Sequence, residues 1–327
     1  MEQAPPPASP GGTPGDEPLR PADTPPSEGS RAAAAEPSRL APTEPQPAWP
    51  PWFAFVGFVA ALTGTLVAVG VIAVVAGIES GDDTPTLTIV ATLVQGVFFV
   101  GTALVLARSI TTPRPWHFGF RRAPLWGTVG WAVLGMLSFY LVTAIYAVLV
   151  DPSAEQEVTE SLGADDGTFG LIAAGVMVIV VAPVVEELFF RGFFYRALRT
   201  RYPIVIAAVI DGLVFGIIHF DFEGADGLLL LPPLALLGLI FCLVYERTGT
   251  LYSVIGLHAL NNTVAFSAQA DDGWRVAIVA GPLMLVACAV VPRLLPHGPA
   301  PLPPAPPAPP APSGGVGPDP RLSSRVE

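Results

Sequence analysis

Residues 181–199 read VAPVVEELFFRGFFYRALR and place Glu186, Glu187 and Arg191 within a long apolar stretch. A charged side chain within a membrane-spanning helix costs roughly 2.5–3.5 kcal/mol on insertion scales, so such residues are functional candidates. Glu187 and Arg191 are four residues apart, so they share one helical face in the orientation that favours an ion pair. Glu186 is turned about 100° away from that face. It is therefore the carboxylate that remains available for chemistry.

The rest of the chain has the composition of a membrane protein. Of 327 residues, 51% are hydrophobic and 13% are charged, whereas a soluble domain carries about 25% charged residues. Eight apolar stretches are each about as long as a helix that crosses 30 Å of hydrocarbon, and lipid cannot satisfy the backbone of an open sheet. We therefore predict an all-α polytopic membrane protein with about eight transmembrane helices. They lie near residues 52–78, 86–107, 125–150, 168–195, 203–220, 228–245, 250–268 and 274–292.

Two polar tails flank this body. Of the 38 prolines, 15 fall in residues 1–51 and 12 in residues 296–320. Chains of this composition bury too little apolar area to offset the entropy of ordering. We therefore predict disordered, proline-rich tails at residues 1–50 and 296–327. The helical transmembrane domain then occupies residues 52–295, with its catalytic core at about 168–268.

A net charge of −11 argues against nucleic acid as a partner, because nucleic acid requires a basic face.

The distribution of the charges indicates how the chain is oriented. Cytoplasmic linkers of membrane proteins collect arginine, and here the arginines gather in alternate linkers. They are Arg108, Arg114, Arg121 and Arg122 in one linker, and Arg191, Arg196, Arg199 and Arg201 around another. With an even number of spans, we expect both termini in the cytoplasm and the chain in the plasma membrane.

Two later apolar stretches also carry polar side chains. Residues 211–219 read DGLVFGIIH, and residues 251–266 read LYSVIGLHALNNTVAF. If the spans at 168–195 and 203–220 form an antiparallel hairpin, Glu186 and His219 lie within roughly 5 Å of the same depth. They can then meet. Asp211 lies on the same helical stripe as Phe215 and His219, but about 12 Å from His219 along the helix, too far for direct contact. We expect it to be a hydrated acid at the membrane interface; the alternatives are that it tunes His219 or lines the substrate entry.

These residues carry a family resemblance. Glu186-Glu187-x-x-x-Arg191, Phe215-x-x-x-His219 and His258-x-x-x-Asn262 resemble the three ordered motifs of the CPBP family, which includes the type II CAAX prenyl endopeptidases and the bacteriocin-processing or immunity (ABI) proteins. The similarity covers about 90 residues, from Val181 to Phe266. It is specific, because three motifs occur in order, each on a predicted membrane helix.

The resemblance implies an intramembrane endopeptidase that hydrolyses a peptide bond in a hydrophobic or lipid-modified substrate within the lipid bilayer. Glu186 and His219 would activate the attacking water, while His258 and Asn262 would donate hydrogen bonds to the oxyanion, each typically worth about 3–4 kcal/mol. Asn262 could instead join two helices, and Asn261 is its rival as the oxyanion donor.

The family has been described both as glutamate proteases and as metalloproteases. We expect no essential cofactor, because Glu186 cannot easily be both a ligand and the sole base. The alternative is a divalent metal such as zinc held by Glu186, His219 and His258, since one carboxylate and two imidazoles are the protein ligands of some catalytic zinc sites.

Two other functions fit the same residues. A proton-coupled transporter would use the buried acid and imidazoles as a proton relay, but it requires polar residues that continue to the outer face. A non-catalytic immunity or chaperone protein would bind peptides in the cavity that these residues surround.

Cys242 and Cys288 lie in apolar runs and are expected to be core residues.

Overall fold

The computed structural model describes residues 47–78, 84–150, 158–219 and 226–295. The first predicted tail is described only from residue 47 onward, and the whole of the second, residues 296–327, lies outside the described residues. All regular structure in the described ranges is helical, which confirms the predicted all-α fold class. Trp49, near the end of the first predicted tail, is buried against Phe118 and Phe193.

Each of the eight predicted spans corresponds to a helical segment. One segment is a continuous run of α6 (Gly167–Val176), η3 (Met177–Val181), α7 (Ala182–Glu187), η4 (Leu188–Phe194) and α8 (Tyr195–Arg199). The others are α2 (Trp52–Ala76), α3 (Pro85–Ile110), α4 (Leu125–Val150), α9 (Ile204–Ile218), α10 (Leu231–Thr248), α11 (Leu251–Gln269) and α12 (Trp274–Leu294). Short helical turns are η2 (Pro115–His117), α5 (Val158–Ser161) and η5 (Asp226–Leu230).

Six segments in the described part of the chain are long and apolar enough to cross a membrane. They are α2, α3, α4, the run Gly167–Arg199, the stretch Leu228–Thr248 and α12. Helix α9 has 15 residues and is shorter than a full span, and α11 carries His258 and two asparagines. The predicted number of eight spans is therefore approximate.

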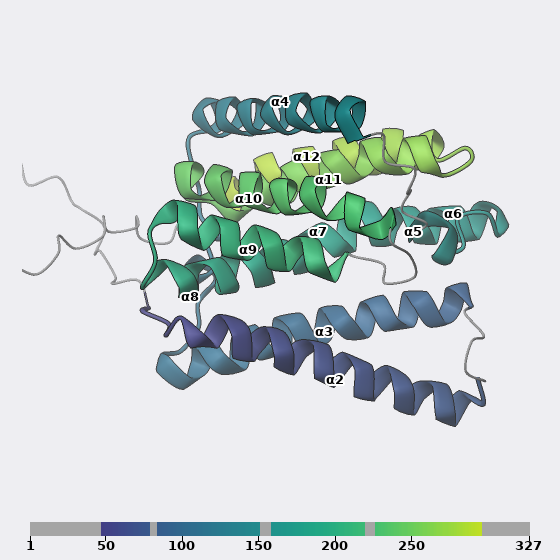
Figure 1. Cartoon of the computed structure of the whole chain (residues 1–327), viewed down its shortest axis with the longest axis horizontal. Coiled ribbons are helices and arrows are strands. Elements are labelled where there is room, and N and C mark those ends of the chain that lie inside the picture. The colour runs from purple at the N-terminus through teal and green to yellow at the C-terminus, as the bar shows by residue number, and fades with distance from the viewer. Residues whose placement is uncertain (1–46, 79–83, 151–157, 220–225, 296–327) are drawn as a thin grey trace, which may run out of the picture. The chain divides into compact units, whose positions relative to one another are not determined.

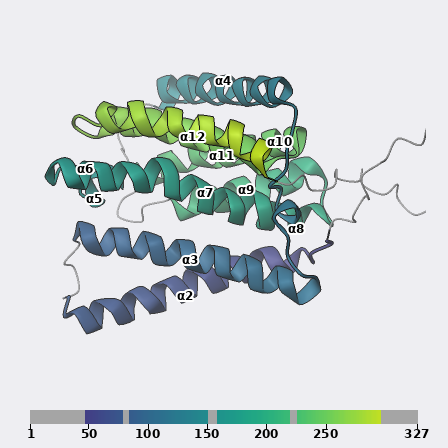
Figure 2. The same cartoon turned by 180° about the vertical axis from the view of Figure 1, so that it is seen from behind.

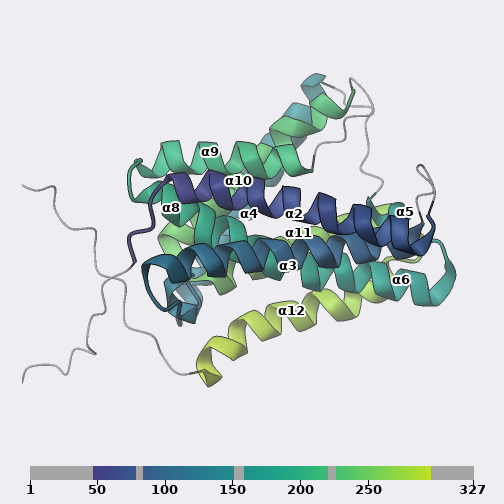
Figure 3. The ribbon, with the colours of Figure 1, turned by 90° about the horizontal axis from the view of Figure 1, so that it is seen from below.

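Neighbouring helices pair along their lengths. Helices α2 and α3 run side by side (Figures 1 and 3), and α11 packs on α12 (Figure 2). Helices α9 and α10 lie close together at two glycines: a Cβ atom on Gly212 would lie 2.5 Å from the carbonyl oxygen of Ala235, and one on Gly238 would lie 2.8 Å from the Cα of Gly212. Small residues at such contacts allow membrane helices to approach. This contact brings Asp211 and Cys242 into the interior.

The helix that carries the two glutamates is interrupted by π-helical turns. The N–H of Ala182 donates to the carbonyl of Met177, five residues back, and the N–H of Tyr195 donates to that of Phe190. Pro183 contributes to the first turn, because proline has no N–H to donate. Turns of this kind often mark functional sites, and here η3 and η4 bracket α7, where Glu186 and Glu187 lie.

Candidate active site

Three side chains from different segments of the chain meet at Glu186. Glu186 lies near the end of α7, His219 follows the last residue of α9, and His258 lies within α11. Glu186 Oε2 is 3.6 Å from His219 Nε2 and 3.9 Å from His258 Nε2. The side chain of Glu186 is 16% exposed and that of His258 is 4% exposed. The structure therefore places these predicted site residues around one largely buried point.

Hydrogen bonds on the far side of each ring fix which nitrogen carries a proton. His219 Nδ1 lies 2.8 Å from the carbonyl oxygen of Phe215, which can only accept, so Nδ1 donates. His258 Nδ1 lies 2.9 Å from Glu187 Oε1, and donates to that carboxylate because Glu187 is paired with Arg191. In a neutral ring the remaining Nε2 is then an acceptor.

Three acceptors consequently converge: both Nε2 atoms and the Glu186 carboxylate. Glu186 Oε2 is buried and has no hydrogen-bond partner among the described residues. A water molecule held among these three acceptors can donate to two of them.

A second, fully buried cluster supports His258. Arg191 Nη1 lies 2.9 Å from Glu187 Oε1, and its Nε lies 3.6 Å from Asp211 Oδ1. Arg191 Nη2 donates to the carbonyl of Gly238 at 2.9 Å, and the side chains of all three charged residues are 0% exposed. Glu187 Oε1 thus accepts from both Arg191 and His258.

Our expectation that Asp211 is a hydrated interfacial acid is wrong. The carboxylate is buried, faces Arg191 and accepts a hydrogen bond from Cys242 Sγ at 3.1 Å. That expectation considered only the distance from Asp211 to His219. It overlooked Arg191, which lies on the neighbouring helical segment η4. The available signal was the chemistry of Arg191: a guanidinium has five N–H donors, and one glutamate cannot satisfy them all. Cys242 is buried as expected, but it also donates to Asp211.

Asn262 lies one helical turn beyond His258. Its Nδ2 donates to the carbonyl of Val178, in η3, at 2.9 Å. A primary amide nitrogen carries two N–H groups, so this bond fixes the orientation of the side chain and leaves a second donor. Asn261 instead contacts Tyr140 and Asn262.

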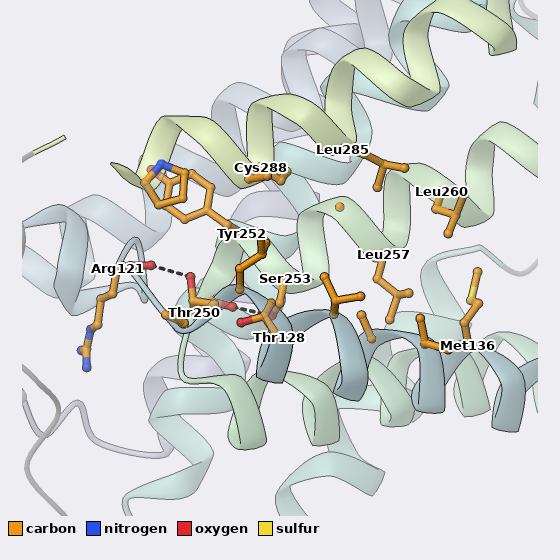
Figure 4. Close-up of a pocket in the computed structure, with 18 of the residues that line it drawn as sticks. Arg121, Thr128, Met136, Thr250, Tyr252, Ser253, Leu257, Leu260, Leu285 and Cys288 are labelled. Atoms are coloured by element: carbon orange, nitrogen blue, oxygen red, sulfur yellow. Dashed lines mark hydrogen bonds between the residues drawn. The ribbon is translucent and has the colours of Figure 1, made fainter. Parts of the chain in front are cut away.

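The structure also contains a cavity of about 490 Å³ between α4, α11 and α12 (Figure 4). Thr250, at one end, donates to the carbonyl of Arg121 and its own carbonyl accepts from Ser253. Glu186, His219 and His258 are not among the residues that line the cavity. Helix α11 thus presents His258 to the site and Leu257 to this separate, mainly apolar space.

The apolar helices and the buried cluster of acids and imidazoles define an integral, multi-pass membrane protein with a candidate hydrolytic site. Residues 168–264 match the family described as "Type II CAAX prenyl endopeptidase Rce1-like". The matched segment contains all three motifs, and so the resemblance is confirmed for this region. The matched family is one of membrane proteases.

Three relatives are similar to part of the chain. The chain is 31% identical over 102 residues to "Putative membrane peptidase YdiL" of Bacillus subtilis (strain 168), which covers 30% of this chain and 39% of the relative. It is 31% identical over 96 residues to "Uncharacterized protein YyaK" of the same organism (28% and 32% coverage). It is 30% identical over 132 residues to "Uncharacterized 24.3 kDa protein" of Escherichia coli (40% and 59% coverage). The chain thus spans less than two thirds of each relative, and no solved structure matches it significantly.

Proposed function

We propose that this protein is an intramembrane endopeptidase that hydrolyses a peptide bond in a hydrophobic or lipid-modified, membrane-associated substrate. The observation that carries the proposal is the convergence of Glu186 Oε2 with His219 Nε2 at 3.6 Å and His258 Nε2 at 3.9 Å. These groups supply a base, a proton carrier and a charge stabiliser in a site with little access to bulk water. The Rce1-like match over the same residues supports the reaction class.

In the proposed reaction, Glu186 takes a proton from water as the water attacks the substrate carbonyl carbon, and His219 orients that water. The tetrahedral oxyanion then accepts hydrogen bonds from His258 Nε2 and Asn262 Nδ2. The proton passes from the Glu186–His219 pair to the leaving amine, and the C–N bond breaks. Proton transfer by a positioned group contributes about 10²–10⁴-fold to a rate.

The role of His258 has a consequence for its protonation. Its Nδ1 already donates to Glu187, so Nε2 can donate to an oxyanion only when the ring carries both protons. Glu187 Oε1 lies 2.9 Å from Nδ1 and Glu186 Oε2 lies 3.9 Å from Nε2, so each ring nitrogen faces a carboxylate oxygen.

We propose that water is activated without a metal. Two ligands of one tetrahedral zinc, each about 2.0–2.1 Å from the ion, lie about 3.3 Å apart. The corresponding separations here are 3.6 and 3.9 Å, and Glu186 would have to serve both as a ligand and as the sole base. The test is activity after dialysis against a chelator, with metal content measured in the same sample. Loss of activity on chelation, restored by zinc, would support the alternative.

We also propose that both termini lie in the cytoplasm of a plasma-membrane protein. The support is the arginine-rich linker between α3 and α4, together with Arg196, Arg199 and Arg201 around the turn from α8 to α9. Protease protection of terminal tags in intact and permeabilised cells tests this orientation: both tags should be cleaved only after permeabilisation.

The function is tested with purified protein in lipid nanodiscs, using fluorogenic peptides ending in a CAAX sequence, with and without a prenyl group. We expect cleavage by the wild type and a loss of at least about 100-fold in kcat for Glu186→Gln and for His219→Ala. A peptide that binds but is not cleaved by the wild type would indicate a non-catalytic binding protein. Unchanged turnover in both variants would refute the proposed chemistry.

A further inference from the structure

We propose that Asp211 is a positioning residue for His258, acting through Arg191 and Glu187. This inference rests on the proposed peptidase function. Asp211 lies outside the three sequence motifs, and it has no direct role in the mechanism described above. Its contacts nevertheless connect it to the candidate site through two consecutive side chains.

The connection begins at Glu187, whose Oε1 atom accepts two charge-assisted hydrogen bonds. One comes from Arg191 Nη1 at 2.9 Å and the other from His258 Nδ1 at 2.9 Å. The position of this single oxygen therefore depends on where the guanidinium lies. A displacement of the guanidinium moves Glu187 Oε1, and the imidazole that donates to it must follow or lose its partner.

Three anchors from three helices fix the guanidinium. They are Glu187 on α7, Asp211 on α9 and the carbonyl of Gly238 on α10. The guanidinium is planar and its donors form a rigid fork, so fixing several of its edges fixes its orientation. Among the contacts of the described residues, Asp211 is the only one of these three anchors that faces Nε of Arg191.

The side chains around the Arg191 guanidinium leave it little room to move in other directions. The rings of Phe215 and Phe241 lie 4.5 and 5.1 Å from the central carbon of the guanidinium. Cys242, on α10, donates to Asp211 Oδ1 and so orients that carboxylate. Without the charge of Asp211, the guanidinium loses the ion pair on its Nε side and is free to shift toward Glu187. Because a misplacement of about 1 Å can cost about 100-fold in rate, the site should respond to this distant change.

The test compares Asp211→Asn, which keeps the shape and removes the charge, with Glu246→Gln as a matched control. Glu246 also pairs with an arginine, Arg199, at 2.9 Å, but it does not contact the candidate site. We expect Asp211→Asn to lower kcat by between about 10-fold and 100-fold and to leave KM within about twofold. Glu246→Gln should leave both constants unchanged. A kcat for folded Asp211→Asn within twofold of the wild type would overturn the inference.

A double-mutant cycle separates positioning from a purely structural role. In a His258→Ala background, Asp211→Asn should have no further effect on the residual kcat, because its effect passes through the imidazole. An equal loss in both backgrounds would overturn the inference. If Asp211→Asn does not fold, Asp211→Glu retains the charge at an altered position, and should lower kcat with KM unchanged. An unchanged kcat in that variant would also overturn it.

The same proteins distinguish failure of the inference from failure of the proposed function. Cleavage by the wild type and its loss in Glu186→Gln establish the function independently of Asp211. If the wild type does not cleave, the cycle is read from melting temperatures. We expect the effects of Asp211→Asn and His258→Ala on Tm not to add, since the residues share Arg191 and Glu187. Additive effects would contradict the connection.

Discussion

Replacement of Arg191 by methionine should destabilise the protein strongly, and the structure sets the size of the effect. The guanidinium is completely buried and lies between Glu187, at 2.9 Å, and Asp211, at 3.6 Å. Methionine has a similar length but no charge, so Arg191→Met leaves two buried carboxylates without a counter-charge. Removing one partner of a buried ion pair costs about 3–5 kcal/mol. For a domain of this size, such a loss lowers Tm by roughly 6–20 °C.

The matched control is Arg199→Met. Arg199 and Glu246 are also 2.9 Å apart, but their side chains are 24% and 26% exposed. Ion pairs in contact with water contribute about 0–1 kcal/mol, so this variant should melt within roughly 4 °C of the wild type. Thermal unfolding in detergent, followed by tryptophan fluorescence, measures both. Equal losses of Tm in the two variants, or no loss for Arg191→Met, would refute the reasoning from burial.

The remaining predictions concern the oxyanion donor, the helix contact and the buried thiol. Asn262→Ala should lower kcat by about 10²–10³-fold, whereas Asn261→Ala should stay within a few-fold, and the reverse result in a peptide-cleavage assay would reassign the donor. Gly212→Leu should prevent folding or lower Tm sharply, because its Cβ would meet the backbone of α10 at 2.5 Å. Gly130→Ala, where a Cβ meets nothing within 4 Å, should not lower Tm, because alanine favours a helix over glycine. Cys242→Ser retains a donor to Asp211 and should melt near the wild type, whereas Cys242→Val should lower the free energy of unfolding by about 1–3 kcal/mol. Equal melting temperatures for the two variants would contradict the hydrogen bond.

Much of this architecture follows from the sequence because its causes are local or one-dimensional. The length of each apolar stretch predicts a helix, and the four-residue spacing of Glu187 and Arg191 predicts the pair that the structure contains. Counting residues from the turn between the spans at 168–195 and 203–220 predicts that Glu186 and His219 lie at one depth, and their side chains are 3.6 Å apart.

The buried cluster could not be predicted in the same way, because it depends on how helices rotate against one another. Asp211 on α9 faces Arg191 on η4, and the residue after it, Gly212, meets Gly238 where α9 lies close against α10. The π-helical turns beside α7 also change the angle between successive side chains, so an ideal helical wheel misplaces residues beyond them. The shared use of Glu187 by Arg191 and His258 depends on both effects.

The central claim is that water activated by Glu186 attacks the peptide carbonyl directly. A single turnover in H₂¹⁸O, with enzyme in excess over a cleavable CAAX peptide, tests it. Direct attack by water places one ¹⁸O atom in the new carboxyl group of the product, and the Glu186→Gln variant should form no product in the same time. A first-turnover product whose new carboxyl lacks ¹⁸O would show that an oxygen of the enzyme attacks first, and cleavage that persists in Glu186→Gln would show that this carboxylate is not the base.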